Sequence, residues 1–162
     1  MTKGAVMEGD RRYQLWRIWD KKQPLLLYIL LNPSNADAAV DDRTVLKLVQ
    51  ISKNLGYGGF YLGNLHSFIT PYPAVLKYYI IMNDSLNLMH LKKMVEKCEK
   101  VVLGWGNSGH TPQWLWETVK QTYCFGLNQN NSPKHPLYLP FNSQLIPFEY
   151  DKVLAKKSER IT

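Results

Sequence analysis

The sequence predicts an α/β fold of three layers, α/β/α, in which helices cover both faces of a central and mostly parallel sheet. Apolar runs typical of strands alternate along the chain with amphipathic patterns typical of helices, which favours parallel strands joined by helical crossovers. The run from Leu25 to Leu31 is apolar throughout, as expected for a strand that is buried on both faces. The chain is 45% hydrophobic and 20% charged, as is usual for a globular protein.

The expected elements follow the order β-β-α-β-α-β-α-β. Strands are predicted at 13–19, 25–31, 60–64, 101–105 and 123–127, and helices at 44–54, 85–95 and 113–121. Asp41 or Asp42 can cap the first helix and Asp84 or Ser85 the second, because these side chains accept hydrogen bonds from free backbone N–H groups. A turn at 21–24 is expected to lead from the first strand back into the second.

The bulk properties are those of a basic protein without membrane-spanning features. The 20 Lys and Arg against 13 Asp and Glu give a net charge of +7, which attracts polyanions. The basic residues are dispersed, however, so a solvated surface explains the charge as well as a nucleic-acid footprint does. No apolar run is long enough to span a membrane, and no signal peptide is apparent at 1–10. Cys98 and Cys124 form neither a metal motif nor a disulfide framework. We therefore expect a monomeric, cytoplasmic protein in which residues 1–150 form one domain and 151–162 a basic C-terminal tail.

Polar residues gather directly after the predicted strands, where α/β folds usually bind their ligands. These segments are 31–35, 64–67, 104–110 and 134–138. They carry Asn, His, Ser and Gly, while the nearest acidic residue, Asp37, lies further from its strand. The sequence therefore predicts a site for a neutral, hydrogen-bonding ligand, without a metal ion or a cofactor.

Four of these segments together resemble the motifs of the uracil-DNA glycosylase superfamily. They are Leu30-Leu31-Asn32-Pro33-Ser34, Phe60-Tyr61-Leu62-Gly63-Asn64, Leu103-Gly104-Trp105-Gly106-Asn107 and His135-Pro136. The whole chain also resembles an uncharacterised bacterial and phage family near that superfamily, domain of unknown function 1643. The four motifs occur in the superfamily's order and span most of the predicted domain.

The resemblance implies a role for each matching residue. Asn32 would hold the attacking water, Asn64 would bind the edge of the base, and His135 would stabilise charge on the departing base. Further base contacts would come from Pro33 and from an aromatic residue, for which Phe68, Tyr72 and Trp105 are candidates. Ser34, Gly106, Asn107 and Ser108 would form the loops that contact phosphate.

Two positions depart from the superfamily pattern. Leu31 stands where a small residue is usual, which puts access beside Asn32 in doubt. Leu137 follows His135-Pro136 where the superfamily has a small serine that grips phosphate, which weakens the case for DNA. Each of these residues also has a purely structural explanation. Asn32, Ser34 or Asn35 can cap the following turn, Asn64 can bind its own loop, and His135 can brace an extended segment. Gly104 and Gly106 can serve tight turns, and Trp105 can belong to the core.

These observations lead to a hypothesis and two alternatives. The hypothesis is a DNA N-glycosylase-like hydrolase that excises a damaged or modified base, taken from the stack by base flipping. Because the Asn32 amide cannot accept a proton as a carboxylate does, such an enzyme would be slow or would act on an unusually good leaving group. The alternatives are a non-catalytic module that binds nucleic acid or a modified base, and an N-glycosidase that acts on free nucleotides or nucleosides.

Overall fold

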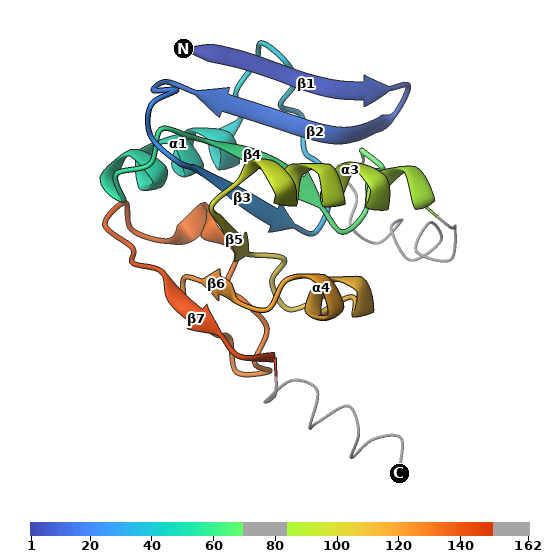
Figure 1. Cartoon of the computed structure of the whole chain (residues 1–162), viewed down its shortest axis with the longest axis vertical. Coiled ribbons are helices and arrows are strands. Elements are labelled where there is room, and N and C mark those ends of the chain that lie inside the picture. The colour runs from blue at the N-terminus through green and yellow to red at the C-terminus, as the bar shows by residue number, and fades with distance from the viewer. Residues whose placement is uncertain (70–83, 151–162) are drawn as a thin grey trace.

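The computed structural model describes residues 1–69 and 84–150. The strands are β1 (Thr2–Glu8), β2 (Arg11–Ile18), β3 (Leu25–Leu30), β4 (Gly59–Asn64), β5 (Lys100–Leu103), β6 (Thr122–Cys124) and β7 (Ile146–Phe148). The helices are α1 (Arg43–Asn54), α3 (Ser85–Lys97) and α4 (Gln113–Thr118), with a 3-10 turn, η2, at Pro136–Tyr138. Figure 1 shows how these elements are arranged around one sheet.

The described strands form one mixed sheet in the order β1-β2-β4-β3-β5-β6-β7. The α/β class is confirmed, and β4, β3 and β5 are neighbouring parallel strands as predicted. The prediction of a mostly parallel sheet is wrong, because only the centre of the sheet is parallel. The strands β1, β2 and β7, at the two sides of this centre, pair antiparallel. The pattern from the sequence did not predict β1 or β7, and β2 pairs with β4 rather than with β3, which directly follows it in the chain.

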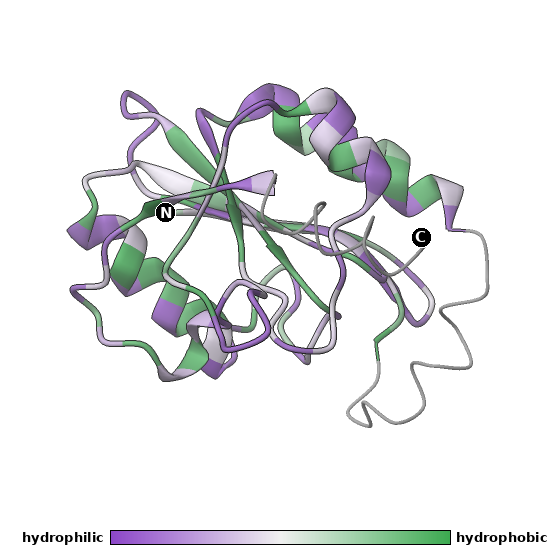
Figure 2. Ribbon diagram, turned by 90° about the horizontal axis from the view of Figure 1, so that it is seen from below, coloured by the Kyte–Doolittle hydropathy of each residue, from purple (hydrophilic) through white to green (hydrophobic). Residues whose placement is uncertain are grey.

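Two hydrophobic clusters cover the two faces of the sheet. Alternate residues of β3 point to opposite faces, so Leu26, Tyr28 and Leu30 pack with α1, whereas Leu27 and Ile29 pack with α3 and α4. Figure 2 shows helices on both sides of the sheet, with hydrophobic residues toward it. The continuous apolar run of β3 is thus explained by burial on both faces.

The helices begin within about one residue of the predicted positions; α1 ends at Asn54 as predicted, whereas α3 continues beyond the predicted 85–95 to Lys97. Asp42 caps α1 by accepting a hydrogen bond from the Val45 amide at 2.9 Å, and Asp84 caps α3 by accepting one from Asn87 at 3.2 Å. The helix predicted at 113–121 ends at Thr118, and the strand predicted at 123–127 covers only Thr122–Cys124. The strand predicted at 101–105 ends at Leu103, which leaves the following glycine-rich segment as a loop.

Arg17 of β2 ties the chain after β3 to the sheet. Its side chain is 0% exposed, and its Nε lies 2.7 Å from Oδ1 of Asp41. Its Nη2 donates to the carbonyl oxygens of Asp37 at 2.6 Å and Val40 at 3.3 Å. The charge of Arg17 therefore stabilises a loop that would otherwise leave backbone acceptors without donors.

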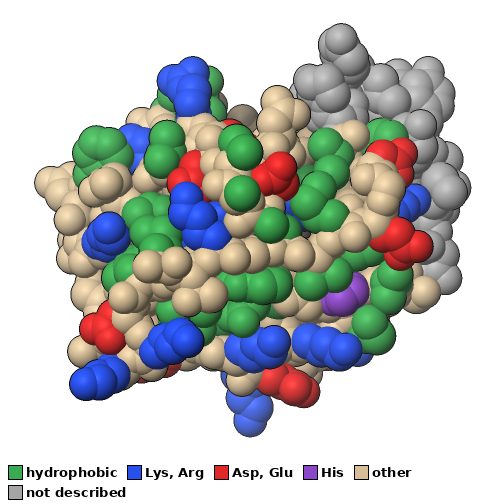
Figure 3. Space-filling view, turned by 90° about the horizontal axis from the view of Figure 1, so that it is seen from above, with side chains coloured by type: hydrophobic (Ala, Val, Ile, Leu, Met, Phe, Trp, Pro, Cys, Tyr) green, Lys and Arg blue, Asp and Glu red, His purple; other side chains and the backbone are tan. Residues whose placement is uncertain are grey.

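The surface charge is dispersed. Figure 3 shows Lys and Arg side chains spread over the face seen from above, with acidic and hydrophobic side chains among them. In the described parts of the chain, every helix is too short or too polar to cross a membrane. The predicted basic tail at 151–162 lies outside the described residues.

Candidate functional site

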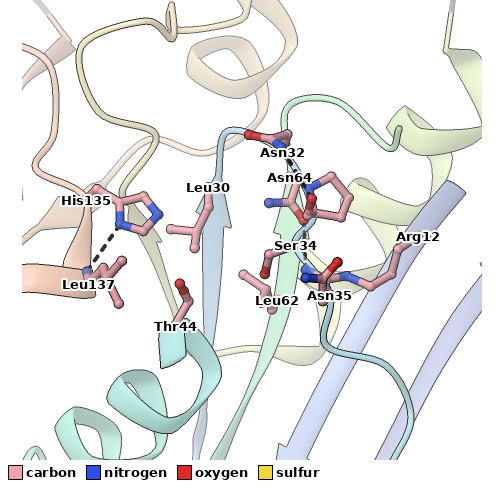
Figure 4. Close-up of a pocket in the computed structure, with 11 residues that line it drawn as sticks. Arg12, Leu30, Asn32, Ser34, Asn35, Thr44, Leu62, Asn64, His135 and Leu137 are labelled. Atoms are coloured by element: carbon pink, nitrogen blue, oxygen red, sulfur yellow. Dashed lines mark hydrogen bonds between the residues drawn. The ribbon is translucent and has the colours of Figure 1, made fainter. Parts of the chain in front are cut away.

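A pocket of about 270 Å³ opens at the carboxyl ends of β3 and β4, on the face covered by α1. It brings together Asn32, Asn64 and His135, three residues that the sequence analysis selected from three separate segments of the chain. Figure 4 shows His135 on one side, Asn64 and Arg12 on the other, and Leu30 between them. The lining residues are Arg12, Leu30, Asn32, Pro33, Ser34, Asn35, Thr44, Leu62, Asn64, His135 and Leu137.

The sheet topology explains why these residues meet. Leu30 and Asn64 are register partners at the ends of parallel β3 and β4, so their side chains lie on the same face. Because β2 runs antiparallel to β4, the first residues of β2 reach this same edge of the sheet. Arg12 thereby enters the site.

Asn64 is held firmly from two sides. It is 1% exposed, its carbonyl oxygen accepts a hydrogen bond from Asn87 Nδ2 at 2.9 Å, and its side-chain Oδ1 accepts one from Arg12 Nη2 at 3.4 Å. Arginine has only donors, so the amide oxygen must face Arg12. The amide nitrogen of Asn64 is buried without a hydrogen-bond partner among the described residues. In Figure 4 this nitrogen points toward the side of the pocket where His135 lies.

Arg12 is a buried cation at the wall of the pocket. It is 2% exposed, and its Nη1 donates to the Ala36 carbonyl oxygen at 2.9 Å. Burial lowers the pKa of Arg12 to about 10, an effect that the charge of Asp42 partly offsets. The guanidinium therefore remains protonated at neutral pH.

His135 is poised as a neutral hydrogen-bond donor. It precedes η2, and its Nδ1 accepts a hydrogen bond from the Leu137 amide at 3.2 Å. Burial lowers the pKa of His135, and the charge of Asp42 offsets this only in part. The neutral ring consequently carries its proton on Nε2, and Figure 4 shows that nitrogen directed toward the pocket.

The loop after β3 supplies Asn32, Pro33 and Ser34. Asn32 donates from Nδ2 to the Pro33 carbonyl oxygen at 3.3 Å, and Pro33 is buried. Ser34 is exposed and donates to the side chain of Asp42, the cap of α1. The capping explanation therefore accounts for part of what Ser34 does, while its position still lines the pocket.

The loop after β5 supports the site from outside the pocket. A Cβ at Gly106 would lie 3.9 Å from that of His135, so the two segments are adjacent. Asn107 accepts from Ser132 Oγ at 3.1 Å through its side chain, which ties its loop to the turn before His135. Asn107 and Ser108 are exposed, and neither is among the residues lining the pocket.

The aromatic candidates for base stacking are not brought to the pocket in the described residues. Phe68 forms an isolated β-bridge with Arg11 and is not a lining residue. Trp105 is 3% exposed and packs edge-on against Phe148, so it belongs to the core. Tyr72 lies outside the described residues.

Gly104 permits the close approach of the His135 segment to β3. A Cβ there would lie 2.8 Å from Leu30 Cδ2 and 3.2 Å from Pro136 Cδ. We predict that Gly104→Ala lowers the free energy of unfolding by about 1–3 kcal/mol, since one of these groups must shift. Urea denaturation measures the loss. Gly63→Ala is the matched control: its Cβ would meet Leu91 Cδ2 at 2.6 Å, on the opposite face, so it should destabilise the fold without altering the pocket.

Sequence reasoning missed Arg12, and with it the charge of the site. The lining residues include no Asp or Glu, so their donors and the Arg12 cation suit a ligand rich in acceptors. The available signal was the position of Arg12 directly before the alternating run that predicted a strand at 13–19; in the structure Arg12 belongs to that strand, and the residues from Arg12 to Leu15 are all buried. In the described part of the chain, no three His, Cys, Asp or Glu side chains gather as they would to hold a metal ion.

Comparison with known proteins gives a family and no function. No curated protein and no solved structure matches the chain. One family model, described as a protein of unknown function (DUF1643), matches residues 12–137. All the residues that line the pocket, from Arg12 to Leu137, lie within this match. The resemblance of the sequence to domain of unknown function 1643 is thus confirmed: the chain belongs to the DUF1643 family.

Proposed function

We propose that the pocket binds a nucleobase and that the protein hydrolyses an N-glycosidic bond, with a damaged or modified base in DNA as its substrate. The observation that carries the proposal is the meeting of Asn32, Asn64 and His135 in one pocket. Its volume of about 270 Å³ lies near the lower end of small-molecule sites and suits a single planar ring.

Each of the three residues has a part in the proposed reaction. Asn32 orients a water molecule whose oxygen attacks C1′ of the sugar. The bond between C1′ and the base nitrogen breaks, its electron pair remains on the base, and the water loses a proton to solvent. His135 donates a hydrogen bond from Nε2 to the base as this negative charge develops, and Asn64 binds the edge of the base.

A second candidate is a module that binds a base without cleaving it. It is favoured by the chemistry of Asn32, whose amide cannot act as a general base, and by the lack of any carboxylate among the lining residues. The two candidates share the ligand and differ only in turnover. A third, cleavage of free nucleotides or nucleosides, uses the same residues.

We further propose that the fold is related to that of the uracil-DNA glycosylases. The parallel core of β4, β3 and β5, with helices packed on both faces, supports this relation. So does the order of the four motifs, three of which lie at the ends of β3, β4 and β5 and the fourth at the start of η2. The antiparallel strands at the two sides of the sheet are additions that the motifs do not explain.

The direct test is a panel of oligonucleotides, each with one modified or mismatched base, incubated with the protein and assayed for abasic sites. Abasic sites that depend on His135 support the glycosylase. Binding without abasic sites supports the binding module, and release of base only from free nucleosides supports the third candidate. If neither oligonucleotides nor nucleotides bind at moderate salt, a nucleobase is not the ligand.

We predict that Asn64→Ala reduces discrimination among bases by about 1–3 kcal/mol, because one paired edge contact is lost. Competition titrations with a set of bases measure this discrimination. Asn54→Ala serves as the control, since Asn54 is exposed at the end of α1 and bonds the Phe141 carbonyl oxygen at 2.9 Å. Equal loss of affinity for every base, with unchanged ratios, would contradict the assigned role of Asn64.

A further inference from the structure

Arg12 is a buried cation that forms no direct ion pair in the part of the chain that the structure describes, and only the more distant charge of Asp42 offsets its burial. The ion pairs among the described residues join Lys3 and Arg17 to Asp41, and Arg11 to Asp84, so none includes Arg12. The side chain of Arg12 donates hydrogen bonds to two neutral oxygens, those of Ala36 and Asn64, and its Nε is buried without a partner among the described residues. A buried charge without a directly paired counter-charge is costly, so a positive group in this state points to a function.

A second unpartnered donor lies beside it. Within the described ranges 1–69 and 84–150, the side-chain nitrogen of Asn64 is also buried without a partner, and Arg12 fixes the amide so that this nitrogen faces a ligand. Both residues line the pocket, and no lining residue is acidic. The side of the pocket opposite His135 is thus cationic and rich in donors.

We propose that Arg12 makes this side of the pocket a subsite for the anion of an acidic nucleobase. The inference rests on the proposed function and narrows its substrate class to bases whose ring N–H is easily ionised, and which therefore leave readily as anions. A positive charge in a low-dielectric site favours such an anion far more than it would in water. Such a substrate compensates for the weakness of Asn32, which orients water without taking its proton. A base that leaves readily as an anion requires less activation of the attacking water.

The test compares uracil with 6-azauracil by equilibrium titration of the full chain at about pH 8. The two rings have nearly the same shape, but the additional ring nitrogen acidifies the N–H, so that 6-azauracil is mainly an anion and uracil mainly neutral. We expect the parent protein to bind 6-azauracil on the order of 10-fold more tightly. This comparison requires no variant and so does not depend on how a substitution folds.

Variants then assign the preference to Arg12. Arg12→Met removes the charge at similar volume, and proteins often tolerate the replacement of buried ionic groups by apolar side chains of similar size. This variant should bring the ratio of the affinities for 6-azauracil and uracil to about one. Arg12→Lys keeps the charge and should retain most of the preference. Lys134→Met is the matched control: it removes one positive charge next to His135, but Lys134 is exposed, so solvent screens its effect and the ratio should not change.

The outcomes separate this inference from the function on which it rests. Equal binding of both bases by the parent protein overturns the anion subsite and leaves nucleobase binding standing. A preference that persists in Arg12→Met overturns the assignment to Arg12. Competition by inorganic phosphate that is lost in Arg12→Met means that Arg12 binds a phosphate group, and overturns the base anion. If neither base binds, the inference fails, and the abasic-site assay decides the proposed function independently.

Discussion

His135→Ala is expected to slow base release by about 100- to 1,000-fold, the usual effect of removing one donor from a developing negative charge. The affinity for the intact substrate should change far less, because in the proposed reaction the charge that His135 stabilises appears only in the transition state. Single-turnover cleavage and equilibrium binding, measured on the same oligonucleotide, separate the two effects. Since burial lowers the pKa of His135, the neutral donor persists on mild acidification, and the rate should remain constant down to about pH 6.5, its ordinary pKa.

His135→Gln is the control for this prediction, because glutamine keeps an N–H donor on a side chain of similar reach. It should recover part of the rate that alanine loses. A His135→Ala protein that loses affinity and rate equally would show that the residue holds the substrate throughout. A parent protein that never cleaves, with the His135→Ala effect confined to affinity, would favour the binding module.

The second large effect is expected at Arg17. Arg17→Ala should lower the free energy of unfolding by about 3–5 kcal/mol, because it leaves Asp41 and two loop carbonyl oxygens without their buried donor. This is a large share of the roughly 5–15 kcal/mol that stabilises a typical domain. Urea denaturation at neutral pH measures it.

Lys3→Ala is the matched control for Arg17→Ala. Lys3 Nζ lies 3.2 Å from Oδ2 of the same Asp41, but the Lys3 side chain is 36% exposed, so its removal should lower the free energy of unfolding by only about 0–1 kcal/mol.

The contacts of Asp41 with Arg17 and Lys3 also predict that the stability of the fold depends on pH. Burial by itself would raise the pKa of Asp41, but the hydrogen bonds from Arg17 and Lys3 outweigh it, and the pKa is lowered. Asp41 therefore contributes stability above its unfolded pKa of about 3.8, and this contribution is lost as the pH falls further. If Arg17→Ala and Lys3→Ala lower the free energy of unfolding equally, burial of the Arg17 side chain does not make its contacts stronger than those of Lys3.

The sequence predicted the centre of the sheet and not its sides, for a physical reason. β3 and β4 are covered on both faces, so burial imposes an apolar pattern that can be recognised locally. β1 is mostly exposed or half-buried, and β7 is three residues long with a proline in the middle. Such edge strands are held by their neighbours, and that pairing leaves little local signal.

The sequence predicted those residues of the candidate site that lie at the ends of predicted strands. It missed the residue whose place depends on the order of the strands in the sheet. Asn32 and Asn64 follow buried strands, so their proximity could be inferred from parallel pairing alone. Arg12 enters only because β2 lies antiparallel beside β4, a choice that the turn at 21–24 does not reveal. The site that the sequence predicts for a neutral ligand therefore carries a cation, since a basic residue counted among dispersed surface charges is buried at its wall.

The wide spacing of the lining residues, from Arg12 to Leu137, also governs how binding and folding are linked. The pocket exists only when β2, β3, β4 and η2 are all assembled, so a fragment that lacks any of these elements loses it. A ligand specific for the native state must then stabilise the whole fold, by about 2.7 kcal/mol at a free concentration roughly 100 times its Kd. Ligands can accordingly be found by the rise they cause in the melting temperature of the intact chain, whatever chemistry the pocket performs.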